Sequence, residues 1–524
     1  MPQGARVDVV DVVDVVVVGA GHNGLVAATF LARAGLTVRV LEEQAVVGGA
    51  VRTERPFARA PNLATSTGAY LLGLMPPELM AKLGLELPLL RRDPHYFLPT
   101  TGSRYLLLGS DRDAARRQFT AFFSDADWHA NEALQAEIGA IRDDIAPTWL
   151  EAPRSLEETA DRYVRPALRQ VFIDLCRRPV SDYLDRFPWK SDLLRVMYAV
   201  TDGFTGLSGG WDSPGTGMNF LVHNMCRLPG SDGTWMIVKG GMGTVTQRLA
   251  DLARAAGATI QTRCGVAAIL REAGAARGVR LADGSELRAH AVVVNADPFR
   301  LRTLVGDGAF PAEFDARLEA WRRPGTSMKV NLALTGLPRF SCLPEDRGQY
   351  GTTTHLLPDE GDALRVVRQA YADAMAGRLP DFPTIEWYLH TPVDPSLKDE
   401  HGRHNSALFV QWVPTEIAGS SWAVEESGFV RHLLSICDRF APGTSDLVLE
   451  AVPLHPKKIE AHFGITGGHI QHIDNSFGFD QRMPYATPLA GLYSASAGCH
   501  PAGAVIGAAG HNAAMKVLAD LGIG

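Results

Sequence analysis

A glycine-rich turn between a strand pattern and a helix pattern constrains this fold most strongly. Asp14 and four valines lead into the hexapeptide Gly19-Ala-Gly21-His-Asn-Gly24, and an Ala/Leu-rich helix is expected from about 23 to 34. A continuous β-branched run is typical of a strand buried on both faces. Gly19 permits the tight turn, Gly21 lets a pyrophosphate approach the backbone, and Gly24 lets the helix pack on the strand. The order strand, turn and helix predicts a dinucleotide-binding βαβ unit.

The next strand ends in an acidic residue. Gly35 is expected to end the helix, residues 37–41 to form the strand, and Glu42 to follow it, 18 residues after Gly24. A carboxylate there can accept both ribose hydroxyls of an adenosine and disfavours the 2′-phosphate of NADP. The alternative is a glycine-rich turn with no ligand.

Two further segments favour FAD over NAD. The pair Gly48-Gly49 forms a close-approach loop soon after the second strand, and Arg52 could meet phosphate or the isoalloxazine; the alternative for Arg52 is a solvated loop arginine. Near the C-terminus, a short strand and a small-residue turn containing Gly498 precede a helix expected from about 503 to 521. Its dipole would stabilise reduced flavin. The alternative is a tightly packed core helix.

At these residues the chain resembles phytoene desaturase-like flavoproteins of the carotenoid desaturase and isomerase superfamily. The branch it resembles most is that of the pyridine nucleotide-disulfide oxidoreductase domain-containing proteins. The motifs lie at 19–28 (GAGHNGLVAA), 239–243 (KGGMG), 265–297 and 498–514. The tail departs from the family pattern, with Ala502-Gly503-Ala504 in place of three glycines and His511 in place of an arginine.

The resemblance implies an α/β fold in which a Rossmann-type FAD-binding domain is interleaved with a mixed α+β substrate domain, as in amine oxidases and phytoene desaturases. The expected FAD-binding domain comprises 1–70, 235–300 and 456–524, and the substrate domain comprises 71–234 and 301–455. It also implies that the backbone near Val266 holds the adenine edge. The predicted cofactor-binding residues are Gly19, Gly21, Gly24, Glu42, Gly49, Arg52, Val266, Gly498, Ala504 and Val505.

Only one dinucleotide fingerprint is evident, so a separate NAD(P)H-binding domain is not expected. We therefore expect the substrate to reduce FAD directly, by hydride transfer to the flavin N5. The leading hypothesis is desaturation or isomerisation of a small apolar substrate. A flavin amine oxidase and a non-catalytic flavin-binding scaffold are the alternatives. The catalytic residues are unassigned: His472 and His500 could lie near the flavin and accept a proton, or each could be a hydrogen-bonded structural histidine. Trp235 could line the pocket or pack in the core.

Bulk properties bound the remaining expectations. A chain of 524 residues needs two or more domains, and a net charge of −7 argues against a nucleic-acid partner. The six cysteines show no CxxC spacing, so no metal site is expected and a cytoplasmic setting fits. No transmembrane helix is expected, while peripheral membrane contact and oligomeric state stay open. Helical patterns are expected over 111–123 and 156–176, and strands over 329–334 and 407–413.

Overall fold

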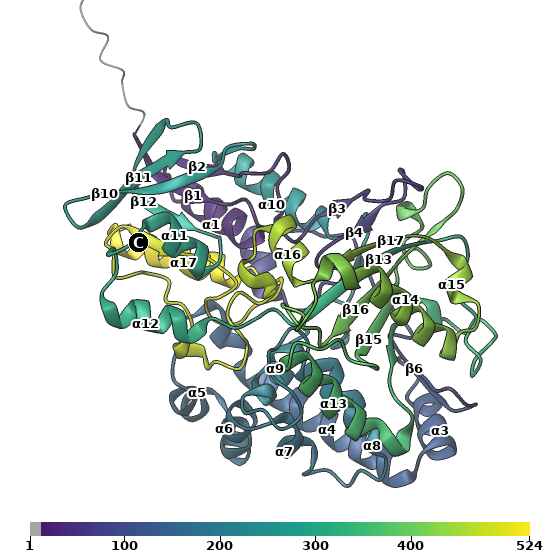
Figure 1. The fold of residues 1–524 in the computed structure, drawn as a ribbon. Helices are drawn as coiled ribbons and strands as arrows, with labels where there is room; N and C mark the ends of the chain where they lie inside the picture. Colours follow the sequence, from purple (N-terminus) through teal and green to yellow (C-terminus); the bar gives the residue numbers. More distant parts are fainter. Residues whose placement is uncertain (1–11, 524) are drawn as a thin grey trace, which may run out of the picture.

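The computed structural model describes residues 12–523, which contain two seven-stranded β-sheets with helices packed around them (Figure 1). Both ends of the described chain belong to the half of the molecule built on the first sheet. Strand β1 (Val12–Val18) is an inner strand of that sheet, and the last helix, α17 (Ala508–Asp520), packs on α1 (His22–Arg33). Two segments almost 500 residues apart in sequence are therefore neighbours in space.

The first sheet has the strand order β10-β11-β12-β1-β2-β9, with β18 paired to β12. The β12–β1, β1–β2, β2–β9 and β12–β18 pairs are parallel, and β10, β11 and β12 form an antiparallel meander. The other strands are β2 (Val38–Leu41), β9 (Thr259–Gln261), β10 (Val266–Glu272), β11 (Ala275–Leu281), β12 (Glu286–Val294) and β18 (Leu492–Ser494). This sheet collects its strands from three separated stretches of the chain.

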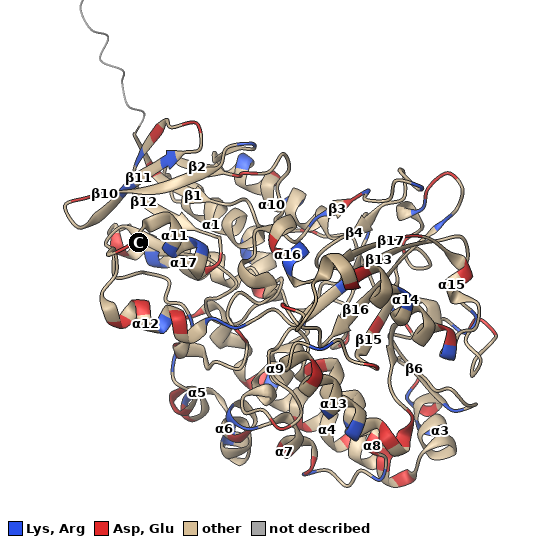
Figure 2. Cartoon of the chain, viewed as in Figure 1, with Lys and Arg blue, Asp and Glu red and all other residues tan. Residues whose placement is uncertain are grey.

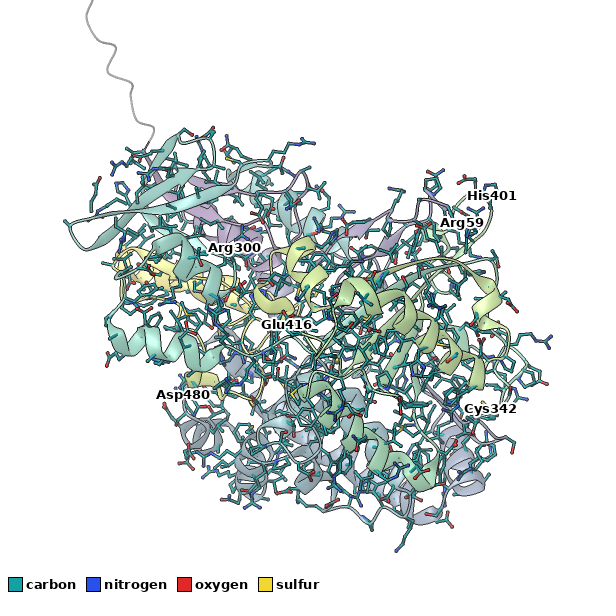
Figure 3. The ribbon with its side chains drawn as sticks, in the orientation of Figure 1. Arg59, Arg300, Cys342, His401, Glu416 and Asp480 are labelled. Carbon is teal, nitrogen blue, oxygen red and sulfur yellow. The ribbon has the colours of Figure 1, made fainter. Side chains whose placement is uncertain are left out.

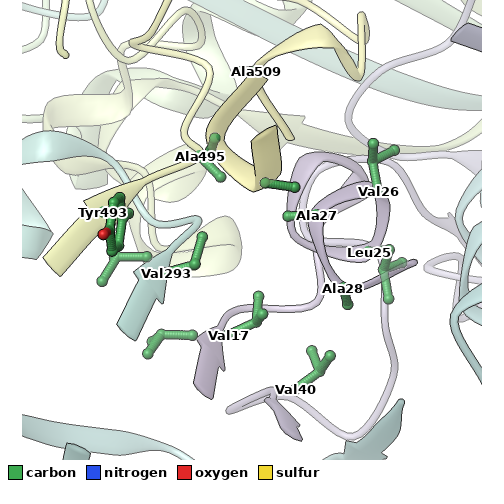
Figure 4. Packing of buried hydrophobic residues seen from close by; sticks show 14 of the residues in the cluster. Val17, Leu25, Val26, Ala27, Ala28, Val40, Val293, Tyr493, Ala495 and Ala509 are labelled. Carbon is green, nitrogen blue, oxygen red and sulfur yellow. The ribbon is translucent and has the colours of Figure 1, made fainter. Parts of the chain in front are cut away.

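The core of this half forms because β1 is apolar on both faces. Val17 is fully buried, and it packs beside Val40 of β2 and Val293 of β12, while Ala27 of α1 and Ala509 of α17 lie above the strands (Figure 4). Burying an aliphatic side chain of this size contributes about 1.5–3 kcal/mol. The strand, turn and helix predicted at the N-terminus are confirmed.

The second sheet has the order β17-β13-β16-β15-β14-β6-β7, and its pairs are antiparallel except for β14–β6. Its strands are β6 (Tyr96–Pro99), β7 (Tyr105–Leu108), β13 (Ser327–Leu334), β14 (Thr353–Leu356), β15 (Thr384–Leu389), β16 (His404–Gln411) and β17 (Val448–Leu454). The two strands predicted here are observed as β13 and β16, although β16 ends at Gln411. Short two-stranded pairs join β3 (Thr53–Glu54) to β4 (Thr65–Ser66) and β5 (Leu89–Leu90) to β8 (Ile237–Val238).

Helices supply the remaining layers. They are α2 (Pro77–Leu83), α3 (Arg112–Phe122), α4 (Asp125–Ile145), α5 (Leu156–Tyr163), α6 (Arg169–Arg177), α7 (Val180–Leu184), α8 (Asp192–Tyr198), α9 (Thr216–His223), α10 (Gly243–Ala255), α11 (Pro298–Val305), α12 (Ala312–Trp321), α13 (Ala363–Met375), α14 (Trp422–Phe440), α15 (Thr444–Leu447) and α16 (Pro456–Phe463). The helical pattern expected over 156–176 is two helices, because Pro166 interrupts it. Helix α3 matches its predicted range, with Asp111 capping its N-terminus.

The predicted start of the C-terminal helix is wrong. Residues 503–507 are not helical, and α17 begins at Ala508, after Gly507 adopts a left-handed conformation with φ of +82°. A Cβ at Gly510 would overlap the carbonyl oxygen of Asn23 in α1. The small residues of α17 therefore serve close packing of two helices, which was the alternative interpretation of this segment.

Acidic and basic residues are interspersed around the outside of the molecule in the view of Figure 2. Among residues 12–523, no helix combines the length and apolar character needed to cross a bilayer. In the same residues no cluster of histidine, cysteine and acidic side chains is arranged to hold a metal ion.

Candidate functional site

A cavity of about 380 Å³ runs between the two sheets, and most of its wall is apolar. The first sheet contributes residues at the ends of β1, β2 and β12, and the second sheet contributes residues of β13, β15 and β16. The cavity therefore joins the dinucleotide motif to a chamber beneath the second sheet. We call the part lined by the second sheet the substrate chamber: Tyr70, Asp202, Thr205, His223, Trp235, Ser327, Lys329, Thr353, Glu386, Tyr388 and Phe409.

Two of the three glycines of the N-terminal turn lie on the cavity wall, and the third is packed behind it. Gly19, with φ of +94°, and Gly21 line the cavity. Gly24 does not reach the wall: a Cβ there would overlap the Gly19 carbonyl oxygen, so its role is close packing of α1 on β1. A Cβ at Gly21 would run into the side chain of Asn295. The backbone of Gly21 is thus open to the cavity only because it carries no side chain.

Glu42 lies at the end of β2 on the cavity wall and is 6% exposed. Its Oε2 accepts a hydrogen bond from the Ala20 amide at 2.8 Å, and its Oε1 accepts one from the Gln44 amide at 2.9 Å. Burial raises the pKa of this carboxyl, and the two amides oppose that effect. The neighbouring Glu43 also lines the cavity, but its side chain is 40% exposed and pairs at 2.6 Å with Arg300 of α11, which is labelled in Figure 3. The two adjacent acids therefore have different surroundings.

Gly49 and Arg52 lie in the loop that follows. A Cβ at Gly49 would lie 3.7 Å from the Gly21 Cα, so this loop packs directly on the glycine turn. Arg52 is 6% exposed and lines the cavity; its Nη2 donates to the His462 carbonyl oxygen at 3.3 Å, and its guanidinium lies 5.2 Å from the Phe463 ring. Its Nε has no hydrogen-bond partner among the described residues. A buried donor without a partner suits an anionic ligand group.

The remaining predicted residues divide in the same way. Val266, the first residue of β10, lines the cavity, and so do Ala504 and Val505. Gly498 is not on the wall; its neighbour Ala497 is. A Cβ at Gly498 would lie 3.1 Å from Pro298, so this glycine permits packing against the start of α11.

The substrate chamber follows from the two-residue period of the strands. On β15, Glu386 and Tyr388 face the cavity, while Ile385 and Trp387 pack in the core beneath α14. Alternating side chains point to opposite faces of a strand, so one strand supplies both a packed face and a polar wall. The alternation of polar and apolar side chains is visible in the sequence of 384–389, Thr-Ile-Glu-Trp-Tyr-Leu. Sequence analysis did not assign this segment to the site.

Register brings three chamber residues into one row. Lys329 of β13 lies opposite Phe409 of β16, which lies opposite Glu386 of β15. The Lys329 ammonium donates to the carbonyl oxygens of Ser66 and Gly68, and burial lowers its pKa well below its usual range. Such a row cannot be seen in sequence, because its members are separated by dozens of residues.

Aromatic rings form the rest of the chamber wall. Tyr70 lies 4.4 Å from the ring of Tyr388 and 6.1 Å from that of Phe409, and the Lys329 ammonium lies 4.6 Å from the Tyr70 ring. Trp235 also lines the cavity, so the pocket alternative for this residue holds. The chamber thus combines flat apolar surfaces with a few buried polar groups, which is typical of small-molecule sites.

Comparison with known proteins assigns the chain to a family. Residues 24–339 match the family model for flavin containing amine oxidoreductase. The chain belongs to this family. The Mus musculus pyridine nucleotide-disulfide oxidoreductase domain-containing protein 2 is 33% identical, over 97% of this chain and 94% of that protein. The hydroxyneurosporene desaturase of Cereibacter sphaeroides is 28% identical, over 97% of this chain and 98% of that protein.

Solved structures show the same fold. An oxidoreductase from Methanosarcina mazei superposes with a TM-score of 0.60 at 19% identity, over 97% of this chain and 100% of that one. The predicted α/β fold class and the phytoene desaturase-like resemblance are confirmed. The chain is an FAD-dependent oxidoreductase. The individual domain boundaries stay a prediction.

The cavity of this flavoenzyme suits FAD along its length. The Glu42 carboxylate lies where the ribose is expected, glycine backbone and the unpartnered Arg52 Nε lie where the pyrophosphate is expected, and Ala504 and Val505 lie where the isoalloxazine is expected. Bound FAD supplies the hydride acceptor; these residues would hold and orient it. The assignment of each residue to a part of FAD remains a prediction.

Asn295 is a site residue that sequence reasoning did not assign. It follows β12 and lines the cavity next to the glycine turn. With its amide oriented so that Oδ1 accepts from the Gly21 amide at 3.1 Å, its Nδ2 donates to the Ala495 carbonyl oxygen at 3.2 Å. Asn295 therefore ties β1, β12 and β18 together at the cavity. The signal was a polar residue directly after a buried valine run.

The two candidate histidines have different positions. His472 lines the cavity and is half-buried, and the loss of solvent around its ring lowers its pKa. His22 lines the cavity as well. His500 does not: its Nε2 lies 3.0 Å from the Thr148 carbonyl oxygen, and its ring packs edge-on against Phe479. These contacts favour the structural alternative for His500 over a place beside the flavin.

Proposed function

We propose that the enzyme dehydrogenates a small, largely apolar molecule held in the substrate chamber. The observation that carries this proposal is the continuity of the cavity from Glu42 at the dinucleotide motif to Tyr388 beneath the second sheet. A substrate in the chamber would lie at the flavin end of the same cavity, and the aromatic rings would exclude water from it. The name of the desaturase relative is consistent with removal of hydrogen from adjacent atoms.

An amine is the second candidate substrate. Glu386 is 7% exposed on the chamber wall, and a buried carboxylate beside aromatic rings suits an ammonium group. The name of the matching family model favours the same class. A non-catalytic scaffold is set aside because the family and relatives are oxidoreductases.

Anaerobic mixing tests the proposal. The purified protein, loaded with FAD, is mixed with limonene, geraniol, cyclohexanone or octylamine, and loss of the visible absorbance of oxidised flavin is followed. Bleaching by a terpene or the ketone supports dehydrogenation of a largely apolar molecule. Bleaching by octylamine alone supports the amine alternative. If all four leave the flavin oxidised while dithionite reduces it, the proposal fails.

A further inference from the structure

The chamber holds an aspartate that a rare backbone turn presents to the cavity. Residues Ala199–Gly203 form a π-helical turn (η3) at the end of α8, and Asp202 within it lines the cavity. Such turns are uncommon and occur frequently at functional sites. Tight packing keeps this one in place, because a Cβ at Gly203 would lie 3.0 Å from Val180. The widened turn therefore holds Asp202 at a fixed place on the chamber wall.

Two asparagines orient Asp202. Asn224 donates from Nδ2 to the Asp202 Oδ2 at 3.1 Å, and Asn219 donates from Nδ2 to the Asp202 carbonyl oxygen at 3.0 Å. The carboxyl Oδ1 accepts no hydrogen bond from any described residue. Because Asp202 is on the cavity wall, this oxygen is left for a group inside the chamber.

The second chamber acid is held differently. Glu386 Oε1 accepts from the Thr205 hydroxyl at 3.2 Å and lies 3.6 Å from the His355 Nε2, while Oε2 accepts from the Tyr388 hydroxyl. Burial opposes ionisation of Glu386, but these partners outweigh it and lower its pKa. Both oxygens of Glu386 are therefore occupied, and the group is a fixed anion.

The surroundings of Asp202 favour its protonated form, in contrast to those of Glu386. Tyr96 of β6, Tyr198 of α8, Cys226 after α9 and Glu386 of β15 interact with Asp202, and His223 of α9 lines the same chamber. Burial raises the pKa of both tyrosines and of the thiol and lowers that of His223 to about 4, so these four are neutral near pH 7. The cation Arg92 interacts with Glu386 and its tyrosine neighbours.

Glu386 is therefore the negatively charged group that interacts with Asp202 in the chamber. Burial, and then repulsion by Glu386, raise the pKa of Asp202 to about 7, against the bond from Asn224. One acid is held ionised and the other can exchange a proton near neutral pH. Pairs of acids whose surroundings separate their pKa values in this way are typical of acid–base catalysis.

We propose that Asp202 is the catalytic proton acceptor of the dehydrogenation, with Glu386 as the fixed anion beside it. The inference rests on the proposed function. Dehydrogenation removes two hydrogens from neighbouring substrate atoms: one leaves as a hydride to the oxidised flavin, carrying both electrons, and the other leaves as a proton to Oδ1 of Asp202. The double bond forms between the two atoms. After the product leaves, water enters the chamber and Asp202 returns its proton to it.

The test compares D202N with D480N in the FAD-loaded protein. Asp480 is an exposed aspartate at the edge of the molecule and is the matched control (Figure 3). The rate of anaerobic bleaching by the best of the four probe compounds is measured from pH 5.5 to 8.5. Wild type and D480N should bleach faster as the pH rises through about 7, because only the ionised carboxylate accepts a proton. D202N should bleach about 10²- to 10⁴-fold more slowly, the contribution typical of a general base, with a flat pH profile.

An infrared titration gives a second readout that needs no turnover. The protonated carboxyl band of Asp202 should be present in wild type and D480N at pH 6 and lost by pH 8, and it should be missing in D202N at both. FAD content should be equal in all three proteins. Wild type and D480N are sufficient to measure both the band and the rate profile, so the test can still be read if D202N fails to fold.

The outcomes separate the two proposals. If wild type bleaches but D202N bleaches equally fast with the same pH profile, the role of Asp202 is refuted and the proposed function stands. A wild-type spectrum with no carboxyl titrating between pH 6 and 8 refutes the role as well. If no probe bleaches wild type, the proposed function fails first and the inference falls with it.

Discussion

The raised pKa of Asp202 predicts a change in the free energy of unfolding that can be measured without a substrate. Replacing it with asparagine keeps the shape and removes the ionisation. The pKa of Asp202 is about 7 in the folded chain, against 3.8 for a free aspartate. That difference corresponds to about 4 kcal/mol. Because the pKa of Asp202 is higher in the folded chain than in the unfolded chain, protonation of Asp202 stabilises the fold. This contribution to the free energy of unfolding is complete below pH 3.8 and is lost as the pH rises to 7.

The expected result is a stability difference that grows with pH. Relative to wild type, the free energy of unfolding of D202N should increase by about 3 kcal/mol between pH 5 and pH 8. Urea unfolding of the FAD-loaded proteins at the two pH values measures this change, with D480N as the control that should show none. If D202N and wild type differ by the same amount at both pH values, Asp202 does not have the raised pKa on which its role depends.

Three further predictions concern the cofactor site. Glu42→Gln should weaken FAD binding by about 1–3 kcal/mol, the value of a lost charge-assisted hydrogen bond, whereas Glu43→Gln should not; equilibrium dialysis that finds both variants alike would contradict the ribose assignment. Arg52→Met should also lower FAD affinity and leave the apoprotein folded by circular dichroism, and unchanged affinity would place the pyrophosphate elsewhere. Gly24→Ala should lower thermal stability by about 1–3 kcal/mol through overpacking, while Gly139→Ala in α4, where a Cβ would meet only the Arg142 side chain at 3.6 Å, should not; equal melting curves would contradict the close contact of α1 with β1.

The N-terminal half of the cofactor site could be predicted because its signals are local. Residues Asp14 to Glu42 contain a strand, a turn, a helix and a second strand in direct succession, and each has its own residue preferences. The structure places them as that pattern requires. The cofactor itself also follows from the sequence, since the family match confirms FAD.

The C-terminal tail was predicted less well because small residues suit several structures. A run of glycine and alanine fits a helix start, a turn or a close helix contact equally. The left-handed Gly507 and the contact of Gly510 with Asn23 decide between them, and both depend on the folded context. The helix therefore begins later than composition suggested.

The substrate chamber could not be assembled from sequence at all. Lys329, Phe409 and Glu386 become neighbours only through the register of three strands. Asp202 is placed on the chamber wall by a π-helical turn, which no residue pattern in the sequence predicted. Buried polar residues within otherwise apolar strands were the available signal, but nothing in the sequence shows which of them share a cavity.

A crystal structure of the protein grown with FAD would test the central claim most directly. The account predicts the adenosine at Glu42, the pyrophosphate beside Gly21 and Arg52, and the isoalloxazine beside Ala504, with one ring face open to the substrate chamber. A flavin whose reactive face is turned away from the chamber, or FAD bound outside this cavity, would contradict it.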